Sequence, residues 1–142
     1  MVHRNDKLVW GLFCLRFGLG LFIILWGIDK LIDPANAIAI FRSYYIVNID
    51  WVTTMLVGTA EVVLGAFITL GLYKRYSYAL GLLVHATATL ARYGILLAPF
   101  GKNDAIIASV PILFAFIALF LCRDFDTKLT LQKKKSIFFH RK

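Results

Sequence analysis

Four ionisable side chains lie inside apolar stretches of this 142-residue chain, where charge is costly: Arg16, Glu61, His85 and Arg92. Guanidinium and imidazole groups can donate hydrogen bonds to an oxygen that gains negative charge, and a carboxylate can accept a proton. A central arginine costs about 3 kcal/mol to insert into a membrane, so such residues usually face a partner or a wet cavity. These residues are therefore the candidates for a polar core that binds a ligand or passes protons.

The chain that must position them has the composition of a membrane protein. It is 60% hydrophobic and carries a formal net charge of +8. A helix that spans a bilayer needs about 20 mostly apolar residues. We therefore predict an all-α integral membrane four-helix bundle as a single domain over residues 1–126, followed by a basic cytoplasmic tail at 127–142. Its predicted spans are residues 8–28, 51–73, 76–98 and 105–122.

The basic residues predict the orientation of these spans. Eleven of them fall on the side of both termini and three on the opposite side. The positive-inside rule then places both termini in the cytoplasm of a bacterium, with the protein multi-pass in the inner membrane. Between the first two spans, Asp33 and Pro34 are typical of a helix start, so residues 34–46 should form a short amphipathic helix on the outer face. We expect the tail to contact membrane lipids and not nucleic acid.

The predicted spans bring three of the charged groups to one depth. At 1.5 Å per residue, Arg16, Glu61 and His85 each lie within about 3 Å of the middle of their spans, and Arg92 lies about 7–8 Å outward. Each also shares a helical face with small residues, which mark helix contacts in membranes. Two arginines against one glutamate leave an excess positive charge, for which water, a lipid phosphate or an electron-rich ligand would have to compensate.

The residues leave several roles open. Arg16 and Glu61 form either an ion pair that fixes two helices or one wall of a cavity or proton relay. His85 is either a hydrogen-bonded core residue or a group that transfers protons, binds a quinone carbonyl or holds a metal. Arg92 either reaches the interface or anchors an anion, and Lys30 is expected as an interfacial anchor that could also reach a ligand. No metal site with several histidines and no nucleotide-binding or nucleophile motif is present in the sequence, so catalysis itself stays undecided.

The sequence resembles the DoxX-like family of four-span membrane proteins over roughly residues 10–122. The similarity lies in "LRFGLGLFIILWGIDKLIDP", in "EVVLGAFITLGLYKRYSYALGLL" and in "GLLVHATATL". The resemblance implies an inner-membrane bundle, and some relatives are membrane subunits of thiosulfate:quinone oxidoreductase. Related maturation proteins use paired cysteines, a pairing that Cys14 and Cys122 do not reproduce.

The function that we predict is an accessory or redox-linked subunit of a membrane complex that interacts with a quinone. The alternatives are a non-catalytic scaffold subunit and a small solute or proton transporter. A quinone is the cofactor that would fit the polar core, although the sequence does not fix one. The expected partners are membrane lipids together with other protein subunits or a second copy of the chain.

Overall fold

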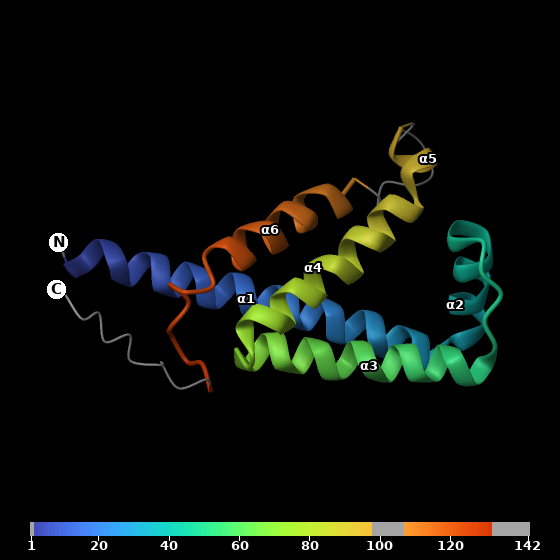
Figure 1. Ribbon diagram of the computed structural model, residues 1–142, viewed down its shortest axis with the longest axis horizontal. Coiled ribbons are helices and arrows are strands. Elements are labelled where there is room, and N and C mark those ends of the chain that lie inside the picture. The colour runs from blue at the N-terminus through green and yellow to red at the C-terminus, as the bar shows by residue number, and fades with distance from the viewer. Residues whose placement is uncertain (1, 98–106, 132–142) are drawn as a thin grey trace, which may run out of the picture.

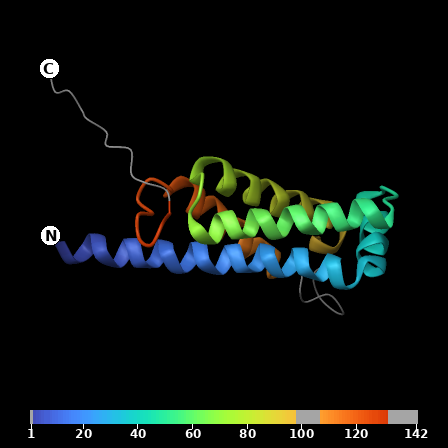
Figure 2. The same cartoon turned by 90° about the horizontal axis from the view of Figure 1, so that it is seen from below.

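The computed structural model describes residues 2–97 and 107–131, and all regular structure in these two ranges is helical. The longer helices run lengthwise, and the short α2 lies across one end of the molecule (Figures 1 and 2). The N-terminal part of α1 extends past the ends of the other helices. The elements are α1 (Val2–Ile32), α2 (Pro34–Ile40), a π-helical turn η1 (Phe41–Tyr45), α3 (Trp51–Leu70), α4 (Lys74–Ala91), α5 (Tyr93–Leu96) and α6 (Ser109–Leu121).

Helices α1 and α3 pack against each other in antiparallel orientation through glycines. A Cβ atom on Gly27 would lie 2.6 Å from the Gly58 carbonyl oxygen, and one on Gly65 would lie 2.7 Å from the Gly20 carbonyl oxygen. No side chain fits at such separations, so the backbones touch directly, as small residues allow between membrane helices. The two contacts fix the register of the pair, with Gly27 level with Gly58 and Gly20 level with Gly65.

The hydrophobic core lies between this pair and the helices α4 and α6. Its fully buried members come from all four helices: Ile23, Ile68, Tyr78, Phe116 and Leu119. Gly81 brings α4 close to α3 and α6, because a Cβ atom there would lie 2.7 Å from Ile68 and 2.9 Å from Phe116. Ring and branched side chains fill the space that the glycine leaves.

Capping residues set the starts of two helices. The Asp33 carboxylate accepts a hydrogen bond from the Asn36 backbone N–H with Pro34 in the first turn, so the predicted start of the helix in 34–46 is confirmed. That segment continues as the π-helical turn η1 to Tyr45. Asp50 caps α3 by accepting from the Thr53 backbone N–H, and hydrogen bonding from Thr53 lowers the pKa of Asp50.

The membrane character rests most directly on two helices. Residues 6–32 and 51–70 form described helices long and apolar enough to cross a bilayer, and α6 is apolar but shorter. The predicted third span, 76–98, differs from the structure, because α4 ends at Ala91 and Arg92 begins a turn into α5. The start of the predicted fourth span and tail residues 132–142 lie outside the described residues.

Candidate functional site

One group of charged residues closes the end of the molecule at which α3 ends and α4 begins. Arg16 of α1 is fully buried, and its Nη1 donates to both carboxylate oxygens of Asp126 at 2.9 and 3.0 Å. Its Nη2 donates to the backbone carbonyls of Lys128 and Leu129 at 3.0 and 3.1 Å. The segment that follows α6 therefore folds back over α1, where Arg16 binds three of its residues.

Asp126 also binds two residues at the start of α4. The Tyr78 hydroxyl donates to Asp126 Oδ2 at 2.5 Å, and Lys74 Nζ donates to the Asp126 backbone carbonyl at 2.6 Å. The Asp126 side chain is fully buried, as is Tyr78. We name Arg16, Lys74, Tyr78 and Asp126 the Arg16 cluster. The buried carboxylate accepts from Arg16 and Tyr78, and its charge is compensated by Arg16 from within the chain, which is the arrangement of a structural site.

The expected pairing of Arg16 with Glu61 is wrong. The glycine contacts between α1 and α3 place Arg16 level with Thr69, which is eight residues, or about 12 Å, from Glu61. The error came from centring each helix on its own apolar run. The glycine contacts place the middle of α3 level with residues 24–25 of α1, because the N-terminal part of α1 extends past α3. All three groups expected to face inward do so: Arg16, Glu61 and His85 are each buried.

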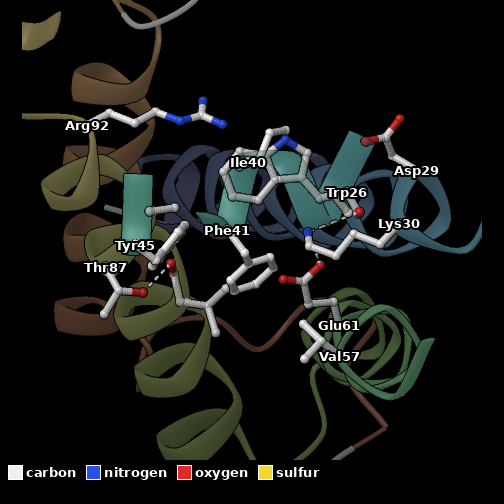
Figure 3. Close-up of a pocket in the computed structure, with 13 residues that line it drawn as sticks. Trp26, Asp29, Lys30, Ile40, Phe41, Tyr45, Val57, Glu61, Thr87 and Arg92 are labelled. Carbon is white, nitrogen blue, oxygen red and sulfur yellow. Dashed lines mark hydrogen bonds and ion pairs between the residues drawn. The ribbon is translucent and has the colours of Figure 1, made fainter. Parts of the chain in front are cut away.

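A cavity of about 260 Å³ lies toward the other end of the molecule, between α1, α2, η1, α3 and α4. We name it the Trp26 pocket (Figure 3). Its walls are mostly apolar or aromatic, and ionisable groups come from α1, α3 and the end of α4. The residues that line it are Trp26, Asp29, Lys30, Ala37, Ile40, Phe41, Tyr45, Val57, Glu61, Val84, Thr87, Ala88 and Arg92.

Glu61 finds its partner in this pocket. Lys30 Nζ donates to Glu61 Oε2 at 2.7 Å and to the Trp26 carbonyl at 3.3 Å, with the Trp26 ring 5.4 Å from the ammonium. Lys30 is therefore more than the simple interfacial anchor expected from its place in the sequence. Its four-carbon stem lets the ammonium reach back along α1 to the level of Glu61.

Arg92 lines the same pocket without an acidic partner among residues 2–97 and 107–131. Its Cζ lies 5.1 Å from the centre of the Tyr44 ring, and its buried Nε has no hydrogen-bond partner. In Figure 3 its side chain extends across the pocket, above Ile40. Burial raises the pKa of the nearby Tyr45 hydroxyl, which keeps that group protonated and able to donate.

His85 occupies a third place, inside the core and off the pocket wall. Its ring packs against Phe22, Trp26 and Phe116, at centroid separations of 5.4 to 5.7 Å. Its Nε2 lies 3.0 Å from the Ser109 carbonyl, which can only accept, so Nε2 carries the proton and donates. Nδ1 is buried and has no partner. The geometry is that of a hydrogen-bonded core histidine joining α4 to α6.

The structure thus separates the sequence candidates into groups. The Trp26 pocket is lined by Lys30, Glu61 and Arg92. Arg16 lies in the Arg16 cluster at the opposite end of the molecule, and His85 lies in the core. Sequence reasoning missed Asp126 and Tyr78, together with the aromatic wall of the pocket. The excess positive charge was the available signal for Asp126, because it called for an acidic residue at a span end.

The arrangement defines a helical membrane protein with one compensated charged cluster and one cavity lined by charged groups. The DoxX family model matches residues 11–94, and the chain belongs to the DoxX family. The match includes Arg16 and every residue that lines the Trp26 pocket, and it ends before Asp126. No curated protein and no solved structure matches the chain significantly.

Proposed function

We propose that this DoxX-family membrane protein crosses the bacterial inner membrane four times, through α1, α3, α4 and α6. Large apolar side chains are exposed on the outer surface of each of these helices, among them Leu25, Leu56, Leu83 and Phe114. Exposed apolar area that extends over a whole molecule is what contact with lipid requires and is rare on soluble proteins. The same pattern on α4 and α6 supports their assignment as spans although α6 is short.

The Arg16 cluster would lie at the cytoplasmic end of the bundle. Basic residues gather there on the α3–α4 turn and after α6, as the positive-inside rule expects of a cytoplasmic surface. The Trp26 pocket would then open toward the outer side of the membrane, where α2 and η1 lie across the helix ends. Both termini would be cytoplasmic.

We further propose that the Trp26 pocket binds the head group of a quinone-type lipid, and that the protein serves as a quinone-binding accessory subunit of a membrane complex. The observation that carries this proposal is a cavity of about 260 Å³ with apolar and aromatic walls and ionisable groups from three helices. A few convergent polar groups in an apolar pocket are the usual pattern of a small-molecule site.

The residues supply complementary chemistry for such a ring. Lys30 and Arg92 can donate to the carbonyl oxygens of the oxidised form, and the Glu61 carboxylate can accept from a hydroxyl of the reduced form. Trp26 and Phe41 offer flat apolar surfaces to the ring itself. Electrons and the protein that exchanges them would come from a partner subunit.

The test titrates a short-chain ubiquinone analogue into the full chain in lipid nanodiscs. Quenching of tryptophan fluorescence measures the binding. The double variant Lys30→Met/Glu61→Gln removes both charges of the ion pair and leaves neither unpaired. We expect affinity to fall about 10-fold or more, because one hydrogen bond to a charged group contributes about 1.5–3 kcal/mol.

The matched control is Asp6→Asn/Lys7→Met, which removes an exposed acidic and basic pair from the same helix. Its affinity should equal that of the wild type. If both double variants bind equally well, or the wild type shows no saturable binding, the quinone proposal is wrong. A partner that copurifies equally with the wild type and the pocket variant would then favour a scaffold.

A further inference from the structure

We infer that the Trp26 pocket binds an anionic ligand, a lipophilic ring whose negatively charged oxygen binds Arg92. This inference rests on the proposed function of the pocket. The inference begins with the charges that line the cavity. Lys30 and Glu61 neutralise each other at 2.7 Å. Asp29 is exposed, and Figure 3 shows it on the opposite side of the pocket from Arg92. Arg92 is therefore the positive charge that the pocket leaves uncompensated.

The surroundings of Arg92 satisfy only part of its bonding capacity. A guanidinium has five N–H donors in a planar fork. The Tyr44 ring lies 5.1 Å from Cζ, which covers one face of the group, while the buried Nε–H has no acceptor. The C-terminal end of α4 contributes about half a negative charge through the helix dipole, which stabilises the arginine without providing an ion pair.

An anionic oxygen would complete this site better than a neutral carbonyl. The charged guanidinium gains a Coulombic attraction from an anionic oxygen that a neutral carbonyl does not offer, and the planar fork of arginine suits a delocalised anion. The rest of the pocket is apolar, with Ile40 beside the Arg92 side chain and Trp26 beyond it. The ligand class is therefore a lipophilic acid such as an ionised hydroxyquinone. An anionic phospholipid shares the same chemistry through its phosphate.

The experiment compares two probes of nearly equal shape, naphthoquinone and hydroxynaphthoquinone, whose hydroxyl is ionised at neutral pH. Both are titrated into the full chain in nanodiscs of zwitterionic lipid. We expect the wild type to bind the anionic probe about 10-fold more tightly, which equals about 1.4 kcal/mol. In Arg92→Gln the two affinities should become equal. Arg42→Gln, which removes an exposed arginine from η1, should keep the 10-fold preference.

The outcomes separate this inference from the proposed function. Equal affinities for both probes in the wild type, or a preference that survives Arg92→Gln, would overturn the anion site and leave the quinone pocket standing. Absence of saturable binding by either probe would overturn both. Competition by phosphatidylglycerol that is lost in Arg92→Gln but kept in Arg42→Gln would support the anion site and identify a lipid phosphate as a source of the anion.

Discussion

The Arg16 cluster and the Trp26 pocket each hold buried or half-buried charges, but they use them differently. At the first, Asp126 accepts from Arg16, Tyr78 and Lys74, and the Arg16 side chain is fully buried. At the second, one ion pair borders a cavity, and Arg92 has no acidic partner among the described residues. The Nε atom of each arginine lacks a hydrogen-bond partner, so the two differ in the ion pair and not in that donor. The difference teaches that a costly charge signals a binding site where the chain itself supplies no opposite charge to pair with it.

The same substitution at the two arginines gives the strongest test of this contrast. Arg16→Gln would leave Asp126 buried without its ion-pair partner, a change that typically costs about 3–5 kcal/mol of unfolding free energy. Arg92→Gln removes no ion pair within the described residues and should cost only about 1 kcal/mol, from the lost Tyr44 contact and helix-dipole interaction. Chemical unfolding in detergent micelles, followed by circular dichroism, measures both. Equal losses in the two variants would remove the distinction between the two regions.

A second test concerns the packing of α1 against α3, the helix pair that runs between the two regions. Gly27→Ala places a Cβ atom 2.6 Å from the Gly58 carbonyl oxygen, and such overpacking costs about 1–3 kcal/mol. Gly18→Ala is the matched control on α1, because nothing lies within 4 Å of its added Cβ atom. The control should be neutral or slightly stabilising because alanine favours helix. The same unfolding assay checks the pair, and a destabilised control would contradict the role given to the Gly27 contact.

The smallest expected effect concerns Asp50, which caps α3 at the end of that helix nearer the pocket. Hydrogen bonding from Thr53 lowers the pKa of Asp50, so its contribution to stability is present above the pKa of the unfolded chain and is lost as pH falls through the folded value. Asp50→Ala should therefore lower the unfolding temperature slightly at pH 7 and not at pH 2. The exposed Asp124→Ala should show no such pH-dependent difference from the wild type. A deficit for Asp50→Ala that persists at pH 2 would contradict the capping role.

Much of the fold could be predicted from the sequence because helix signals are local. The apolar runs predicted the membrane class, small residues predicted the faces at which α1 and α3 meet, and Asp33 with Pro34 predicted the start of α2. The end of α4 at Ala91 could not be predicted, because the apolar run continues past Arg92. Hydropathy does not register a turn that apolar residues can also form.

The site was harder to predict because it depends on helix register. The sequence marked Glu61, Lys30 and Arg92 as candidates, and the structure places all three around one cavity, but their partners depend on how far α1 is shifted along α3. Glycine contacts set that shift, and the sequence around Gly27 or Gly58 does not indicate which glycine of the other helix it contacts. Asp126 lies beyond the apolar runs, and it reaches Arg16 only because the chain reverses after α6.

The direct backbone contact between α1 and α3 also limits how this protein can move. Sliding one helix along the other by a turn would drive Gly27 into Val62 and Gly65 into Ile24, neighbours that already lie at contact distance. In any conformational change, α1 and α3 should therefore move together as one rigid body. Widening of the Trp26 pocket would have to come from displacement of α2 and η1, or from tilting of α4, against that fixed frame.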